Sequence, residues 1–275
     1  MAHIDNMLII IGYTGFALFL YIIIAFVVGT VKKNNGIMDI FYGPAFIVVG
    51  GMSLLMSMLL NGSISYRQIV ILTLIIIWAV RLASYLYVRN QGKPEDYRYQ
   101  ALRKRWKTNI PLKSFLKIYL FQGILIFLIS IPVWFVNISY NPPITSPFDI
   151  NSITMWLGTI FWVIGFLFET IGDFSLYAFK KNPENKGKIM DKSVWRYTQH
   201  PNYFGETLMW WSIFIIALAV PFGFITFIGP AYLTFQIIKV SGVVLLNKRF
   251  RGNDEYADFK KRTSSFIPWF PKKLE

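Results

Sequence analysis

The feature that most constrains this chain is a series of uninterrupted apolar stretches. Each is about 20 residues or longer, enough to span the ~30 Å hydrocarbon core of a bilayer as a helix. Apolar and polar residues do not alternate along these stretches, so the pattern does not predict a membrane β-barrel. We therefore predict an all-α, polytopic transmembrane bundle in which very little could fold as a soluble domain.

The stretches predict seven transmembrane helices within one integral membrane domain that covers residues 1–275. Their approximate ranges are 7–31, 37–60, 66–88, 114–136, 153–179, 205–220 and 222–246. The first is too long for a signal-peptide core and has no basic region before it, so we interpret it as a retained helix. The sixth is short and a tight turn at 221–223 joins it to the seventh, so the alternative for these two is a re-entrant pair.

Basic residues lie almost entirely in alternate loops. Of the 28 Lys and Arg residues, 25 follow the first, third, fifth and seventh stretches, and the opposite loops at 61–65, 137–152 and 221 contain none. The positive-inside rule places the basic loops in the cytoplasm, so we expect an external N-terminus and a cytoplasmic C-terminus. The net charge of +14 then reflects topology and contact with anionic lipids or phosphorylated ligands, and not a nucleic-acid partner.

Composition also narrows the chemistry. The chain has no cysteine, which excludes disulfides, thiolate metal sites and a cysteine nucleophile, and we predict no metal site. The two halves differ in span length and loop charge, which disfavours a transporter built from inverted repeats. A transporter or a non-catalytic lipid-binding protein remains an alternative, although the polar clusters gather on the predicted cytoplasmic side.

Ionisable residues at apolar depth are costly and therefore mark candidate functional sites. Glu169 and Asp173 lie four residues apart on one face of the fifth stretch, where protonation, a cation or a ligand hydroxyl must offset their repulsion. The alternative is that this helix end lies at the membrane interface and both carboxylates are solvated. Arg81 in the third stretch needs a carboxylate or phosphate, in a ligand or in a structural ion pair. Asp39, near the start of the second stretch, is interpreted as a helix cap.

The segment 195–206 has the highest density of chemically functional side chains in the sequence. It places aromatic, amide, imidazole and carboxylate groups at the entry to the sixth stretch. A lone His before Pro is often an ordinary loop residue, but His200 stands beside Asn202, Tyr203 and Glu206. We therefore favour a ligand site here.

A second polar cluster occupies residues 90–99 on the same predicted side. Its Gly92-Lys93 pair lacks the spacing and the following Ser or Thr of a nucleotide-hydrolase phosphate loop. The cluster could still supply cations to phosphates. For the following run at 103–105, charge that sets topology near lipid head groups is the preferred interpretation.

These residues resemble the steroid 5-alpha-reductase family of membrane oxidoreductases, in particular its bacterial DUF1295 branch. The likeness covers about residues 66–275. It is carried by 81–99, by Glu169 to Asp173 with Lys180, by 195–206 with Trp210-Trp211, and by 256–268 with its closing Phe266-Ile267-Pro268. The His-Pro-Asn-Tyr-Phe-Gly-Glu string is fairly specific. A shorter His-Pro-x-Tyr version also occurs in sterol reductases and in isoprenylcysteine methyltransferases.

The resemblance implies a seven-helix fold that holds NADPH in a cavity open to the cytosol. It implies transfer of a hydride to the β-carbon of an enone in a lipophilic, steroid-like or other lipid substrate, in a site kept dry. By position it gives cofactor roles to Lys93, Asp173, Lys180, Asn202, Tyr203 and Glu206, with support from Glu169 and Arg81, and we add Arg196 and His200 as candidate cofactor residues. No catalytic residue is assigned. We expect a monomer in the bacterial inner membrane whose partners are this substrate and membrane lipids.

Four positions depart from the family pattern. Gln199 stands where the family usually has Arg, Ser175 where it has Gln, and Asn247 where it has Glu. Trp78 lies near the position at which the steroid enzymes have a Tyr, so their proton donor is not carried over. The rival enzyme is a methyltransferase that uses S-adenosylmethionine, but residues 246–249 lack the Glu pair typical of that family.

Overall fold

The computed structural model describes residues 2–144, 146–243, 250 and 252–272. The chain divides into two compact units, unit 1 with residues 1–151 and 217–228, and unit 2 with residues 152–216 and 229–275. Apart from an isolated bridge between Thr198 and Ser264, the regular structure of the described residues is helical. This confirms the predicted all-α class.

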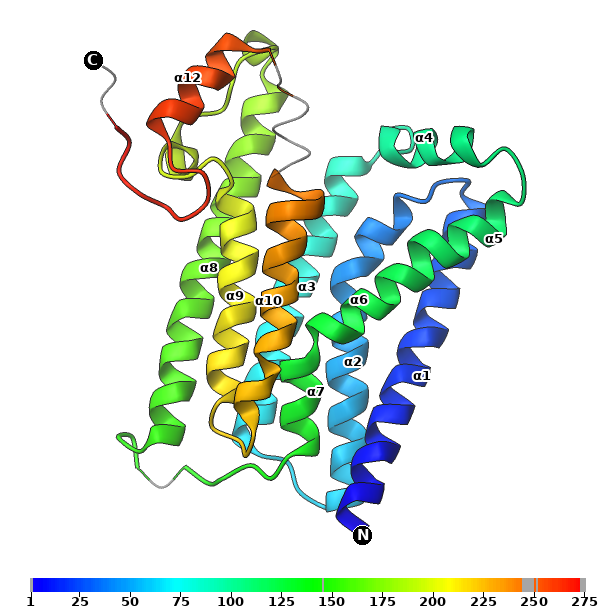
Figure 1. Ribbon diagram of the computed structural model, residues 1–275, viewed down its shortest axis with the longest axis vertical. Coiled ribbons are helices and arrows are strands. Elements are labelled where there is room, and N and C mark those ends of the chain that lie inside the picture. The colour runs from blue at the N-terminus through cyan, green and yellow to red at the C-terminus, as the bar shows by residue number, and fades with distance from the viewer. Residues whose placement is uncertain (1, 145, 244–249, 251, 273–275) are drawn as a thin grey trace. The chain divides into compact units, whose positions relative to one another are not determined.

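Unit 1 consists of three long helices, a broken fourth one and short connections. Their bounds are α1 Ala2–Val31, α2 Ile37–Asn61, α3 Tyr66–Asn90, α4 Tyr97–Trp106, α5 Ile110–Ser114, the π-helical η1 Phe115–Leu120, α6 Phe121–Ile129, α7 Ile131–Ile138 and the 3-10 helix η4 Gly223–Phe227. Helices α1, α2 and α3 lie side by side. Helix α4 lies crosswise to them, at the end of the unit where α3 finishes (Figure 1).

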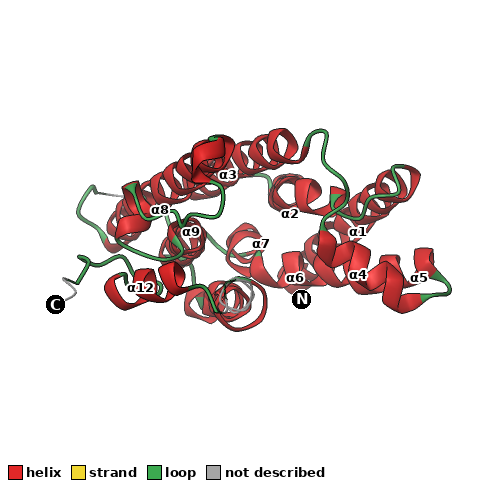
Figure 2. Ribbon diagram, turned by 90° about the horizontal axis from the view of Figure 1, so that it is seen from above, coloured by secondary structure: helices red, strands yellow, loops and turns green. Residues whose placement is uncertain are grey.

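Unit 2 is built around a very long helix. Its elements are α8 Ile150–Lys181, the 3-10 helices η2 Pro183–Asn185 and η3 Ser193–Arg196, α9 Pro201–Ala217, α10 Ile228–Phe235, the π-helical η5 Gln236–Ser241 and α12 Asp254–Arg262. Helices α8 and α9 run alongside one another (Figures 1 and 2), and Trp211 of α9 donates a hydrogen bond to Thr234 of α10. The 32 residues of α8 make a helix of about 48 Å, longer than the ~30 Å of hydrocarbon.

Six helical stretches of the described residues are long and apolar enough to cross a membrane, which supports a multi-pass membrane protein. They are Ile4–Val31, Ile37–Asn61, Tyr66–Asn90, Ile110–Ile129, Ile150–Lys181 and Gly223–Val240. The predicted sixth span corresponds to α9, whose 17 residues are at the lower limit for a spanning helix. The seven-span count and the orientation of the termini therefore stay predictions, and the last residues of the predicted seventh span, 244–246, lie outside the described residues.

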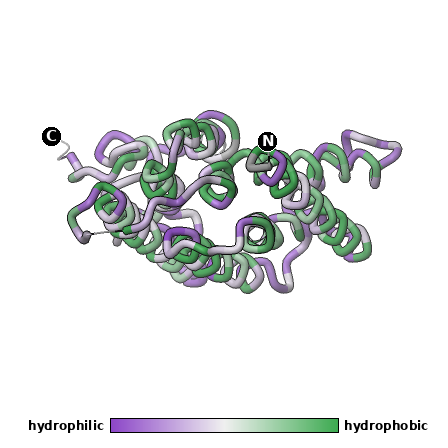
Figure 3. Tube along the Cα trace, turned by 90° about the horizontal axis from the view of Figure 1, so that it is seen from below, coloured by the Kyte–Doolittle hydropathy of each residue, from purple (hydrophilic) through white to green (hydrophobic). Residues whose placement is uncertain are grey.

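The outward faces of these helices are apolar. Leu8 and Phe16 on α1 are 64% and 59% exposed, and Ile124 on α6 is 59% exposed. Figure 3 shows the long helices coloured largely as hydrophobic, with hydrophilic colour concentrated on connecting segments. So much exposed apolar surface is typical of a protein that is solvated by lipid.

The predicted fourth span, 114–136, is wrong as a single helix. The helix stops at Ser130, whose φ of −78° and ψ of 7° leave the α-helical region, and α7 begins afresh at Ile131. Pro132 is the physical reason, because it has no N–H to donate and its ring clashes with the preceding turn of a continuous helix. Composition hides this break, since both sides of it are apolar.

Candidate functional site

A stripe of glycines on α8 sets how closely α9 can approach it. Gly158, Gly165 and Gly172 recur every seven residues and all face α9. A Cβ on Gly165 would lie 2.7 Å from the Gly205 carbonyl oxygen of α9, and a Cβ on Gly205 would collide with the Gly165 carbonyl oxygen. Small residues let helix backbones approach closely in membranes. The glycines therefore bring the first turns of α9 directly against the carboxylates of α8.

Both predicted carboxylates of α8 are buried. Glu169 is 3% exposed and Asp173 is 5% exposed, so the alternative in which both are solvated at a helix end is wrong. The Asn202 side-chain amide on the first turn of α9 donates a hydrogen bond of 3.3 Å to Asp173 Oδ1. The structure thus brings together residues from two of the segments that the sequence singled out.

His200 occupies an unusual environment just before α9. Its side chain is 1% exposed, and within the described part of the chain neither ring nitrogen has a hydrogen-bond partner. The imidazole ring stacks on the Tyr203 ring, with centroids 5.6 Å apart. Gly242 packs closely against the Tyr203 ring, since a Cβ added to this glycine would lie 3.0 Å from Tyr203 Cε2. Burial, and then the charge of Lys260, lower the pKa of His200 to about 4, so the imidazole is neutral near pH 7.

The loop that carries His200 is tied to α8 and to the C-terminal segment. Trp195 Nε1 donates to the Gly172 carbonyl at 3.0 Å. The Thr198 hydroxyl donates to the Phe266 carbonyl at 2.7 Å, and the Gln199 backbone N–H donates to the Ser264 carbonyl at 2.9 Å. These bonds fix the backbone immediately before His200.

Gln199 has a structural role at the position where the resembling family usually has Arg. Its side chain is 3% exposed, and its Nε2 donates to the Thr263 carbonyl at 2.8 Å. The amide therefore joins this loop to the segment after α12. Ser175, another departure, donates its hydroxyl to the Gly172 carbonyl of its own helix at 3.2 Å, and Asn247 lies outside the described residues.

Helix α12 also binds the loop 186–200, which carries His200, at residues earlier in that loop. Arg262 Nη2 lies 2.7 Å from Asp191 Oδ2, and the Ile189 backbone N–H donates to Glu255 Oε1 at 3.1 Å. Ile189, Tyr256 and Phe259 form a small buried cluster beneath these bonds. The closing part of the resemblance, 256–268, thus acts by holding the His200 loop in place.

The basic candidates are exposed or half-buried. Lys180 at the end of α8 and Arg196 in η3 are both exposed in unit 2. Arg81 on α3 is half-buried and Lys93 after α3 is exposed, and both belong to unit 1. Their participation in one cofactor site with the unit 2 residues stays a prediction.

In unit 1 the polar segment after α3 forms an internal network. The Tyr99 hydroxyl donates to Asp39 Oδ1 at 2.7 Å, and Arg98 Nη2 lies 3.5 Å from Asp39 Oδ2. The N-cap of α2 is Gly36 and makes no side-chain cap bond, so the interpretation of Asp39 as a cap is wrong. Burial and the nearby Asp39 carboxylate raise the pKa of Tyr99, which keeps its hydroxyl a donor.

Part of the charge of this segment is used internally. Arg98 Nε lies 2.9 Å from Asp96 Oδ1, and Arg103 Nε lies 3.0 Å from Glu95 Oε2. Glu95 also accepts a bond of 2.7 Å from the Asn35 backbone N–H. Of the basic residues in this cluster, the exposed Lys93 is therefore the candidate for binding a phosphate.

Trp78 has a packing role. It is 3% exposed and meets Phe46 edge-on at 5.5 Å and Tyr42 edge-on at 6.4 Å.

Comparison with protein families decides where the chain belongs. The family model described as "Protein of unknown function (DUF1295)" matches residues 25–263. The chain is a member of the DUF1295 family. The match begins earlier than the expected residue 66, so the likeness of this DUF1295 protein includes the end of α1 and all of α2. No curated protein and no solved structure matches it.

Sequence reasoning missed two parts of the site in this DUF1295 protein. The glycine stripe could have been found from the seven-residue spacing of Gly158, Gly165 and Gly172, which places them on one helical face. The ties of Thr198 and Gln199 to the C-terminal segment have no comparable signal, because they join residues more than sixty positions apart through backbone carbonyls.

Proposed function

We propose that this protein is a membrane oxidoreductase that uses NADPH to reduce a carbon–carbon double bond conjugated to a carbonyl in a lipophilic substrate. Membership of the DUF1295 family and the six candidate spans among the described residues support a membrane setting for this activity. The proposed reaction itself rests on the motif resemblance to the steroid 5-alpha-reductases together with the chemistry of the residues in unit 2.

The observation that carries the proposal is the buried imidazole of His200, which no described residue satisfies, beside the Asn202–Asp173 hydrogen bond. Buried polar atoms are nearly always hydrogen-bonded, so each exception calls for an explanation. A ligand that supplies a donor and an acceptor to the two ring nitrogens is such an explanation.

The residues of unit 2 fit a dinucleotide in their chemistry. Carboxylates and amides, here Asp173, Glu206 and Asn202, are suited to ribose hydroxyls, which both donate and accept. The exposed Lys180 and Arg196 are suited to pyrophosphate and to the 2′-phosphate of NADPH. His200 adds hydrogen bonds without adding charge, because its low pKa keeps it neutral.

The chemistry divides between cofactor and protein. Bound NADPH would supply the hydride to the β-carbon of the enone, and a proton must then reach the α-carbon of the resulting enolate. The protein has to orient both groups and exclude water from them, and the apolar packing of Phe168 and Phe204, with ring centroids 5.2 Å apart, contributes to this beside the His200 loop.

The first experiment measures which cofactor binds. Detergent-purified full-length protein is titrated with NADPH, NADH and S-adenosylmethionine while its thermal unfolding is followed. We expect stabilisation by NADPH. Stabilisation by the methyl donor alone would replace the reductase with the rival methyltransferase.

The second experiment tests the site. Asn202→Ala removes the amide that holds Asp173, and Glu206→Ala removes the carboxylate one turn along α9, so each should weaken NADPH binding about tenfold, equivalent to ~1.4 kcal/mol. Glu184→Ala, which removes an exposed carboxylate in η2, is the matched control and should bind NADPH like the wild type. Unchanged affinity in both α9 variants would remove this segment from the cofactor site.

A further inference from the structure

Arg67 is a buried cation that the proposed reductase chemistry does not use. It lies in the first turn of α3 and is 2% exposed. Its Nη1 donates to Asn141 Oδ1 at 3.3 Å, whereas Nε and Nη2 have no hydrogen-bond partner within the described part of the chain. A buried guanidinium with two unsatisfied nitrogens is costly unless an anion completes its hydrogen bonds.

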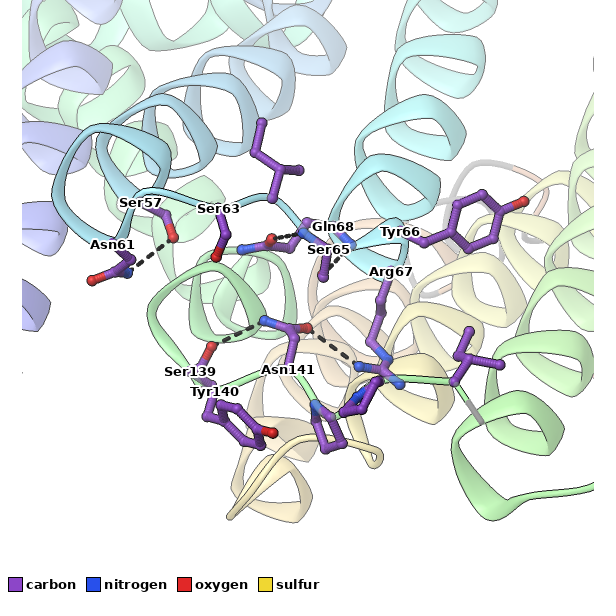
Figure 4. A pocket seen from close by; sticks show the side chains of 14 residues that line it. Ser57, Asn61, Ser63, Ser65, Tyr66, Arg67, Gln68, Ser139, Tyr140 and Asn141 are labelled. Carbon is purple, nitrogen blue, oxygen red and sulfur yellow. Dashed lines mark hydrogen bonds between the residues drawn. The ribbon is translucent and has the colours of Figure 1, made fainter. Parts of the chain in front are cut away.

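Arg67 lies on the wall of a cavity of about 700 Å³ in unit 1. That volume is within the range of small-molecule sites. The cavity lies among the end of α2, the start of α3 and the connection after α7, and its polar wall is formed mainly by Ser57, Asn61, Ser63, Ser139, Asn141 and Arg67. Figure 4 shows the Arg67 guanidinium beside Asn141 on this wall.

The wall is held in place by hydrogen bonds of its own. The Asn141 side-chain nitrogen donates to the Val136 and Ser139 carbonyls, both at 2.9 Å, which turns its oxygen towards Arg67 (Figure 4). Ser65 and Gln68 form a capping box at the start of α3. These bonds fix Arg67 on a rigid helix start, where the helix macrodipole adds further positive potential.

The unused hydrogen-bonding capacity of Arg67 also points to an anion. Asp149 is close enough to attract Arg67 electrostatically, yet it does not satisfy Nε or Nη2. A guanidinium offers paired N–H groups that match the geometry of a phosphate. The hydroxyl and amide groups of the wall provide additional donors for the remaining phosphate oxygens.

The depth of the cavity identifies the kind of anion. Two candidate spans meet here, since one ends at Asn61 and the next begins at Tyr66. The ends of spanning helices lie at the level of the lipid head groups, where phosphates are concentrated. We propose that this cavity is a phosphate-binding site, filled by the head group of an anionic phospholipid or by a soluble phosphate, at the end of unit 1 opposite to Lys93.

The experiment separates the two sources of phosphate. The full-length protein is placed in phosphatidylcholine nanodiscs and its thermal unfolding is measured with inorganic phosphate or with chloride at equal ionic strength. The same measurement is made in nanodiscs that contain phosphatidylglycerol. Stabilisation by inorganic phosphate identifies a soluble ligand, and stabilisation by phosphatidylglycerol alone identifies the lipid head group. No stabilisation in either arm overturns the proposal.

Variants localise the effect. Arg67→Gln should abolish the stabilisation, and Ser63→Asp, which places a negative charge in an exposed loop position of the same wall, should reduce it at least tenfold in affinity even if Arg67→Gln folds poorly. Arg105→Gln removes an exposed arginine of α4 and is the matched control, which should respond like the wild type. An equal response in wild type and in Ser63→Asp would place the phosphate elsewhere and overturn the proposal.

The neighbouring carboxylate gives a test with the opposite sign. Asp149→Asn removes the negative charge that attracts Arg67, so a phosphate should bind several-fold more tightly. Unchanged or weaker binding in this variant would mean that the phosphate does not lie beside Arg67 and Asp149, which would also overturn the proposal.

Discussion

At the level of single residues, His200 shows how burial can decide the chemistry of a side chain. In solution an imidazole changes charge within the physiological range, but here burial and Lys260 lower its pKa to about 4. It therefore acts as a neutral group that can donate from one ring nitrogen and accept at the other. For a ligand that already carries phosphates and faces carboxylates, such a group gives orientation without a further charge.

The low pKa of His200 predicts a pH dependence of stability. The folded pKa lies below the unfolded value of about 6.5, so the unfolded state takes up a proton first as the pH falls. The stability that the neutral His200 contributes to the folded state is therefore fully present above pH ~6.5. It is lost between pH ~6.5 and ~4, a loss of about 3 kcal/mol in the free energy of unfolding. Unfolding midpoints measured from pH 7 to pH 4 should fall less steeply in His200→Gln than in the wild type.

The comparison of the two pH profiles isolates His200, because every other titrating group is present in both proteins. Parallel profiles would show that folding does not lower the pKa of the imidazole, in contradiction to its burial.

Gln199 and Asp39 show which residue roles can be read from a sequence and which cannot. The sequence marked Gln199 as a departure from the Arg of the resembling family, and it gave Asp39 the role of a helix cap. In the structure the Gln199 side chain donates a hydrogen bond to the Thr263 carbonyl, and the Asp39 carboxylate accepts one from the Tyr99 hydroxyl. Both partners are about sixty residues away, and no local pattern encodes such pairings.

At the level of elements, the packing of α8 on α9 depends on the absence of side chains at three positions of α8 and at Gly205. The uninterrupted apolar stretches predicted both helices, and the four-residue spacing of Glu169 and Asp173 predicted that they share a face. The close approach that brings Asn202 to Asp173 depends on glycines, which hydropathy counts as neutral. The helices were therefore predictable from apolar length, whereas their close approach is encoded in the spacing of the glycines and not in hydropathy.

Gly205→Ala should destabilise the protein by about 1–3 kcal/mol, because the added methyl group meets the Gly165 carbonyl oxygen and the Glu169 backbone. The helices must separate to admit it, so NADPH binding should weaken as well. Gly51→Ala is the matched control, since this helical glycine of α2 has open space around its Cβ position. Thermal unfolding and NADPH titration of both variants make the comparison, and equal stability of the two would exclude the glycine contact as a determinant of this packing.

The broken helix after α6 illustrates the opposite limit of sequence reasoning. The boundaries of the second and third spans were predicted within two residues, because a polar turn bounds each of them. The break at Ser130 was missed, because apolar residues continue through it and only Pro132 marks it. Hydropathy locates the ends of spans well but is insensitive to bends within an apolar run.

At the level of the whole molecule, the remaining question is how often the chain crosses the membrane. Within the described part of the chain, six helical stretches meet the length and apolarity of a span, and α9 has 17 residues. With α9 as a crossing, the basic loops all lie on one side, as the positive-inside rule expects. A re-entrant α9 would leave the residues around the turn at Phe222 within the membrane.

The absence of native cysteines makes this topology measurable with single introduced cysteines. Ser63→Cys, Phe222→Cys and Lys104→Cys each place one thiol at an exposed position in a different loop or connecting helix. A membrane-impermeant maleimide should label positions 63 and 222 in intact spheroplasts and position 104 only after lysis, because seven crossings put the first two outside and the third in the cytoplasm. Labelling of position 63 without position 222, before and after lysis, would mean that α9 re-enters and does not cross. Labelling of position 104 in intact spheroplasts would reverse the orientation inferred from the basic loops.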